Sequence, residues 1–266
     1  AVVDEAWSLI SINDAPAGYT HEVVSRDGDE IITTVTTSMR MRRGPIEIPI
    51  EMIVVYRETA DGELLEMSMH TAMSQQKTFT QYEFGDEQVE VLTRQGGREL
   101  TRTEPRPEGE WLTPREVEQY MQRRLEAGAE EIVYRTLVAE GGLVPVQIRH
   151  ERIGTQETEV AGKTVPVTVW NSRTSLMPGV PGVTRLGPEG EAVSSVVNMG
   201  GLKMVTRLAT AEEAREVGAQ QAPELMLTLF IPVDQEIDRP RETTRARYRV
   251  TAKQGDLVAL PSIGAQ

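Results

Sequence analysis

The sequence predicts a mainly β protein, with one large curved antiparallel sheet that forms a half-barrel around one α-helix. Three observations predict this class: apolar residues alternate with period two over most of the chain, glycine-containing turns separate the alternating runs, and one helix is strongly marked. The chain has 266 residues, of which 39% are hydrophobic, so a core can form without disulfides or metals.

Three early runs show the alternation most clearly. Residues 31–41 carry apolar or threonine side chains at odd positions, residues 46–54 carry apolar side chains at even positions, and residues 65–73 return to odd positions. These runs are longer than the usual strand of about five or six residues. Long strands favour a large, strongly twisted sheet.

Short turns lie between the alternating runs. Each of these turns contains at least one glycine. They lie at residues 27–28, 61–62, 85–86 and 96–97, and later at 187–190 and 200–201. Such turns are typical of hairpins, and consecutive hairpins predict an antiparallel meander. Further strands are expected at residues 131–137, 144–153, 157–160, 164–175 and 193–208.

One helix is expected at residues 114–127. Thr113 is a suitable N-cap, Pro114 suits the first helical position, and Glu116 completes a capping box. The apolar stripe of this helix consists of Val117, Tyr120, Met121 and Leu125. We expect the stripe to pack against the concave face of the sheet. A shorter helix is expected at residues 211–217.

A soft domain boundary is expected near residue 220. Residues 1–220 form the half-barrel in this interpretation. The pattern changes after Pro223, and the last ten residues are mostly small and broken by proline and glycine. We therefore expect residues 221–266 to form a strand-containing extension and a linker toward a downstream domain.

Composition excludes several classes of function. The net charge of −13 is unsuited to binding nucleic acid, and no apolar run is long enough for a transmembrane helix. The chain has no cysteine, so thiol catalysis is excluded. Residues 161–164 resemble the end of a phosphate-binding loop, but Glu157 stands where that motif requires glycine. We expect no cofactor.

The three histidines, His21, His70 and His150, fall in three different strand segments and have no ligand partner at metal-binding spacing. We therefore expect no catalytic residue and no metal ligand in this chain. A hydrolase or metalloenzyme with a composite site built from all three histidines is the enzymatic alternative.

Five methionines are in phase with the apolar faces of successive strands: Met39, Met41, Met52, Met67 and Met69. Methionine is flexible and polarisable, so these side chains could line a cavity for apolar or acyl ligands. The alternative is a filled core in which methionine occupies gaps between other side chains. Both interpretations stay open at this point.

Arginines cluster in the last part of the chain, and Arg241, Arg245 and Arg247 are the candidate residues for docking a partner. Arginines on a solvent-facing strand edge, where they discourage edge pairing, are the alternative.

The order of several motifs carries a resemblance. These motifs are Ala17-Gly18-Tyr19, Arg26–Asp29, Met39–Gly44, Glu58–Gly62 and Gly109–Pro114. In this order they resemble the N-terminal, non-catalytic region of bacterial, planctomycete-type transglutaminase-like proteins. More loosely, the pattern is similar to the periplasmic half-barrels of the lipoprotein-carrier class.

The resemblance implies an exported protein, periplasmic or secreted, that acts as an accessory domain before a transglutaminase-like (papain-like) catalytic core. That core needs Cys, His and Asp, and this chain has no cysteine, so no catalytic residue carries over. The implied partner is a downstream catalytic domain of the same polypeptide. The carrier resemblance implies an apolar small molecule held in the cavity of the sheet.

Overall fold

The computed structural model describes residues 1–160, 163–199, 201–218 and 222–224. All of them belong to the first of two compact units, Ala1–Phe230 and Ile231–Gln266. The expected extension at residues 221–266 lies outside the described residues, except for residues 222–224. The expected boundary near residue 220 stays a prediction.

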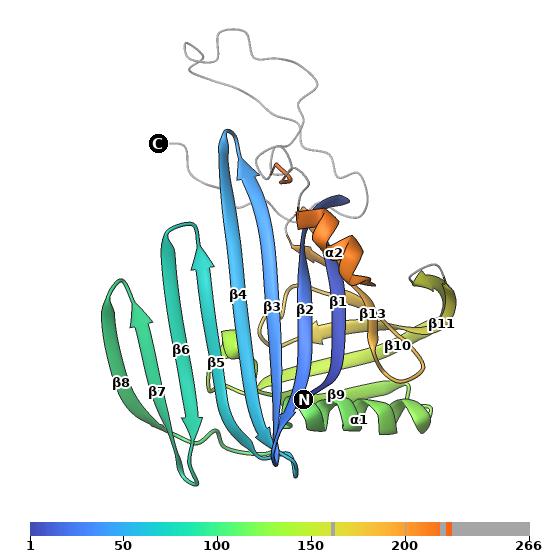
Figure 1. The fold of residues 1–266 in the computed structure, drawn as a ribbon. Coiled ribbons are helices and arrows are strands. Elements are labelled where there is room, and N and C mark those ends of the chain that lie inside the picture. The colour runs from blue at the N-terminus through green and yellow to red at the C-terminus, as the bar shows by residue number, and fades with distance from the viewer. Residues whose placement is uncertain (161–162, 200, 219–221, 225–266) are drawn as a thin grey trace, which may run out of the picture. The chain divides into compact units, whose positions relative to one another are not determined.

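In the described residues, fourteen strands form one antiparallel sheet that is not closed (Figure 1). The first eight strands are β1 (Val2–Ile12), β2 (Ala15–Asp27), β3 (Glu30–Arg43), β4 (Ile46–Thr59), β5 (Leu64–Met73), β6 (Gln76–Phe84), β7 (Gln88–Gln95) and β8 (Arg98–Pro105). The other six are β9 (Glu131–Thr136), β10 (Val146–Val160), β11 (Lys163–Thr174), β12 (Gly182–Leu186), β13 (Ala192–Met199) and β14 (Leu202–Ala209). The predicted large antiparallel sheet is confirmed.

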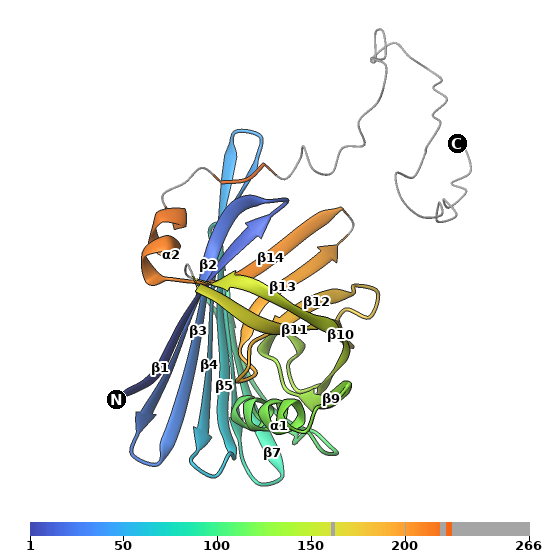
Figure 2. The ribbon, with the colours of Figure 1, turned by 90° about the vertical axis from the view of Figure 1, so that its right-hand side faces the viewer.

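Two meanders make up this sheet. Strands β1 to β8 are neighbours in chain order, as are β9 to β14, and the pairing of β1 with β14 joins the two series. Among the described strands, β8 and β9 are the two edges of the sheet. The sheet curves so that the second meander lies across from the first, with the helix between them (Figure 2).

The predicted turns are where hairpins occur, with two differences in the second meander. Strand β10 runs unbroken from Val146 to Val160, whereas two separate strands were expected there. A register shift between Arg152 and Gly154 accommodates the interruption in the pattern as a bulge. Strand β12 was not predicted, because five residues between two loops give too short a pattern.

Helix α1 (Pro114–Glu126) has the predicted capping box at Thr113 and Glu116. Its Met121 packs with Ile132, Trp170 and Leu186, which belong to β9, β11 and β12. The predicted contact with the concave face is therefore confirmed, but it involves the second meander. The methionine-bearing strands of the first meander contribute nothing to this helix cluster.

A different segment covers the centre of the first meander. Leu137 and Ala139, the latter being the first residue of the short 3₁₀ helix η1 (Ala139–Gly141), pack on Val54, Met67 and Val91 of β4, β5 and β7. Residues between β8 and β10 thus contribute to two apolar clusters of the concave face.

Helix α2 (Ala211–Gly218) lies on the opposite, convex face. Its Ala214 and Val217 pack against Leu9 of β1, with Trp7 and Tyr19 at the margin. Two helices therefore cover two faces of the sheet.

Candidate functional site

Strand register defines which side chains share the concave face with α1. Directly opposed residues lead from Trp170 across neighbouring strands through Thr184, Ser195, Thr206, Ile10 and Gly18 to Met39. Directly opposed residues in a sheet point to the same face. The candidate methionines of β3, β4 and β5 therefore all lie on the concave face, as the period-two pattern predicted.

Two of these methionines belong to a half-buried surface that we call the methionine patch. It consists of Met39, Met41, Leu202 and Met204, which pack against the buried Ile10, Ile12 and Ala17. Each patch side chain keeps part of its surface exposed. The patch therefore presents apolar atoms to the space inside the curve of the sheet.

The other three methionines do not extend this patch. Met67 has no exposed surface and packs beneath Leu137, and Met52 and Met69 flank the same cluster. The filled-core interpretation therefore holds for Met67, and the expectation that it lines a cavity is wrong. Sequence parity placed all five on one face but could not show which of them another segment covers.

Carboxylates form a second surface, the acidic patch, which consists of Glu22 on β2 and Glu118 on α1. Glu22 is opposite Val35 on the concave face. The pKa of Glu22 is raised mainly by burial and, to a smaller extent, by the charge of Asp4. The pKa of Glu118 is raised mainly by burial and, to a smaller extent, by the charges of Glu22, Glu58 and Asp4.

Glu118 combines this raised pKa with an exposed side chain. Desolvation is the largest cause of the raised pKa, and the neighbouring carboxylates add to it because each disfavours a second negative charge nearby. Neither member of the acidic patch was predicted from the sequence, although Glu22 is in phase with Val24, which indicates a carboxylate that faces inward.

Hydroxyl groups lie between the two patches. Thr20 and Thr37 of neighbouring strands share a hydrogen bond of 3.4 Å, and Ser195 and Thr206 are opposed on the other side of β1. The concave face thus changes from apolar at the methionine patch through hydroxyl groups to acidic near α1.

His150 is the centre of a buried polar chain on the same face. Its Nδ1 lies 2.8 Å from the Ser172 hydroxyl, which donates to Thr184 Oγ1 at 2.8 Å, and its Nε2 lies 3.4 Å from the Tyr134 hydroxyl. Because the Ser172 proton is directed to Thr184, Nδ1–H donates to Ser172 and Tyr134 donates to Nε2. Burial lowers the pKa of His150 to about 4, so the ring is neutral.

The other two histidines lie on the convex face. His21 stacks on Trp7 with ring centroids 3.7 Å apart and lies 2.9 Å from the Glu5 carboxylate. His70 is opposite Ile53 and Phe79, away from α1. The structure does not bring the three histidines together, and within the described residues no group of three His, Cys, Asp or Glu side chains could hold a metal.

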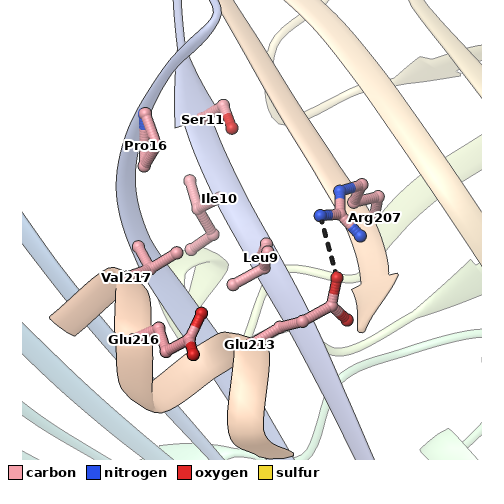
Figure 3. A pocket seen from close by; sticks show the side chains of 8 residues that line it. All are labelled: Leu9, Ile10, Ser11, Pro16, Arg207, Glu213, Glu216 and Val217. Carbon is pink, nitrogen blue, oxygen red and sulfur yellow. Dashed lines mark hydrogen bonds and ion pairs between the residues drawn. The ribbon is translucent and has the colours of Figure 1, made fainter. Parts of the chain in front are cut away.

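A pocket of about 220 Å³ lies beside α2 (Figure 3). Its floor comes from Leu9 and Val217, and its rim carries Glu216 and the ion pair of Arg207 with Glu213 at 3.3 Å. This volume is below the range of about 300 to 1,000 Å³ that is typical of small-molecule sites. We therefore do not take this pocket as the candidate site.

The candidate docking residues Arg241, Arg245 and Arg247 lie outside the described residues. In the part of the chain that the structure describes, no helix is long and apolar enough to cross a membrane.

Comparisons with known proteins bear on the fold. No family model matches the chain, and no curated protein matches it. Among solved structures, the chain is similar to a β-barrel-like protein of domain of unknown function DUF1849 from Brucella abortus. The TM-score is 0.56 at 13% identity, and the match covers 77% of this chain and 95% of the other. At this identity the likeness shows a β-barrel-like fold and nothing of function.

Proposed function

We propose that the protein is a non-catalytic carrier that binds an elongated apolar molecule along the concave face, between the methionine patch and the acidic patch. The observation that carries this proposal is that the methionine patch is half exposed on the inner face of an open sheet, outside the cluster formed by α1. A core in the ordinary sense would be covered there. Following the resemblance, we place this carrier in the periplasm or outside the cell.

Methionine suits such a surface because its unbranched side chain adapts to ligands of different shape. Burial of each ligand methylene contributes about 0.8 kcal/mol before the entropy of binding is subtracted. A chain of moderate length therefore gains enough from the methionine patch and its neighbours for measurable binding.

The acidic patch restricts the head group of this molecule. A ligand carboxylate near Glu22 and Glu118 would meet like charge in a partly desolvated space, where electrostatic repulsion is stronger than in bulk water. An amine or a neutral head group avoids that repulsion. The chemistry therefore favours a cationic or neutral amphiphile over a free fatty acid.

The test pairs Met41→Asp with Met67→Asp. We expect Met41→Asp to abolish the binding of a neutral naphthylamine dye while the melting temperature changes little, because Met41 is half exposed. Met67→Asp should collapse the melting transition, because an unpaired charge would be buried beneath Leu137. Thr34→Asp is the matched control, since this residue lies on the other face of the same strand as Met41.

Displacement of the dye then shows which ligand head group the protein prefers. Dodecylamine should displace the dye at about tenfold lower concentration than dodecanoate, and Glu22→Gln should reduce that preference. No dye binding to the wild-type protein, or a melting transition that collapses in Met41→Asp, would overturn the carrier proposal.

The accessory role implied by the transglutaminase-like resemblance is a second proposal. It is supported by the anchoring of the chain at residues 223–224, where Arg42 N–H donates to the Pro223 carbonyl at 2.8 Å and Gly44 N–H donates to the Glu224 carboxylate. A tether held at the tip of β3 and β4 would fix where a following domain starts. Sequencing the gene beyond Gln266 tests it, since a core with Cys, His and Asp is required there.

A further inference from the structure

Strand β8 is one edge of the sheet, and in the described part of the chain no segment pairs with its outer side. Seven of its eight residues are exposed, including Leu100 with 61% of its surface. Free strand edges tend to pair with other strands, and natural proteins commonly block them with charges.

The hairpin between β7 and β8 determines which backbone groups point outward. Gln95 and Arg98 flank a two-residue turn, in which Gly96 and Gly97 have φ values of 56° and 76°. Residues that flank such a turn exchange both backbone hydrogen bonds, and the bonding direction then alternates along the strand. The backbone groups of Glu99, Thr101 and Thr103 therefore face the free edge.

We propose that this edge pairs with β8 of a second copy of the chain, antiparallel, across a twofold axis at Thr101. Thr101 is then opposite Thr101 of the second copy, and Glu99 is opposite Thr103 of the second copy. All of these residues direct their backbone groups to the edge, so the pairing forms about six backbone hydrogen bonds.

The side chains of β8 are self-complementary in this register. Arg98 is opposite Glu104 of the second copy, and the twofold axis repeats this pair. Leu100 is opposite Arg102 of the second copy, whose aliphatic stem can cover exposed Leu100. Opposite charges on directly opposed residues stabilise a pair of strands.

Neighbouring registers are disfavoured. Because only every second residue directs its backbone outward, one copy can shift only by two residues at a time. A shift in one direction places Arg98 opposite Arg102 of the second copy. A shift in the other direction places Arg102 opposite itself. Like charges directly opposite each other are destabilising, so the charges that block general edge pairing leave this register favoured.

The absence of cysteine allows a direct test of the register. In the proposed pair the Cα atoms of residue 101 lie about 5.5 Å apart, within the range that a disulfide spans. We expect Thr101→Cys to form a covalent dimer in the full chain under mild oxidation. Leu100→Cys, one residue from the axis, and Thr155→Cys, exposed on β10, are the controls and should remain largely uncrosslinked.

Charge exchange tests the same register without a covalent bond. Arg98→Glu and Glu104→Arg should each raise the dissociation constant of the dimer by about tenfold, measured by analytical ultracentrifugation. The double variant Arg98→Glu/Glu104→Arg should restore it, because each pair is again opposite in charge. Circular dichroism checks that every variant keeps its β structure.

A wild-type chain that stays monomeric at high protein concentration would overturn the proposal. Equal crosslinking of Thr101→Cys and Leu100→Cys would also overturn it, because that result indicates random collision. A dimer that the double charge variant fails to restore would indicate another interface.

Discussion

Burial of single residues decides which polar groups of this protein can change charge. His150 is enclosed on the concave face, and its burial lowers its pKa to about 4. Its two ring nitrogens are satisfied by Ser172 and Tyr134 in the neutral form. The ring therefore acts as a fixed part of the core.

This arrangement predicts a loss of stability in mild acid. Between about pH 6.5 and 4 the unfolded chain binds a proton at His150 while the folded chain does not, so the free energy of unfolding falls as the pH falls. From pH 7 to pH 4.5 the loss is about 2 kcal/mol. Urea denaturation of the wild type and of His150→Asn at both pH values measures it.

The variant also serves as the control for other groups. Glu22 and Glu118 have raised pKa values in the folded chain, so the folded state binds their protons more readily than the unfolded state does. Their contribution to the free energy of unfolding therefore rises as the pH falls. It does so in both proteins, so their effect cancels in the comparison. An equal loss in His150→Asn and wild type would contradict the assignment.

At the scale of one element, the N-terminus of α1 is stabilised by both local and long-range interactions. Thr113 accepts from the Glu116 backbone and Glu116 accepts from the Thr113 backbone, which completes the capping box that the sequence indicates. Glu58 of β4 is fully buried and accepts from Arg115 N–H at 3.4 Å. A carboxylate from a distant strand thus interacts with the helix N-terminus, where anionic groups are favourable.

Removal of the cap should cost a predictable amount. Thr113→Ala removes the side-chain acceptor and is expected to lower the free energy of unfolding by about 1 kcal/mol. Glu116→Gln keeps the capping-box geometry and should change it by less than about 0.5 kcal/mol. Denaturant titrations with unchanged slope give both values, and a smaller loss for Thr113→Ala than for Glu116→Gln would contradict the role of the cap.

At the scale of the folded unit, residues between β8 and β10 link the two meanders. Trp111 and Leu137 belong to the cluster of β4 to β7, whereas Met121 belongs to the cluster with Trp170. The pairing of β1 with β14 is a second link. Neither meander can lose its core without exposing side chains of the same connecting segment.

This connection predicts a single unfolding transition for the described unit. The three tryptophans allow a test, because Trp111 reports on the first cluster and Trp170 on the second. In Trp7→Phe/Trp170→Phe and in Trp7→Phe/Trp111→Phe, tryptophan fluorescence should change together with far-UV circular dichroism. A fluorescence midpoint that departs from the circular dichroism midpoint in either variant would show that the meanders unfold separately.

The sequence by itself determined the local features of this protein. Period-two alternation placed the methionines of β3 to β5 on one face, glycine pairs marked hairpins such as Gly96–Gly97, and the capping box fixed the start of α1. These features are readable because each depends on residues a few positions apart.

Only the tertiary structure decided what covers each face. Parity does not distinguish Met67, which lies beneath Leu137, from Met41, which remains half exposed. Nor does any local pattern reveal that the charge of Glu22 acts on Glu118, since residues almost a hundred positions apart influence each other only once the chain has folded. The period of a strand specifies a face, but the covering of that face depends on long-range packing, which has no local signature.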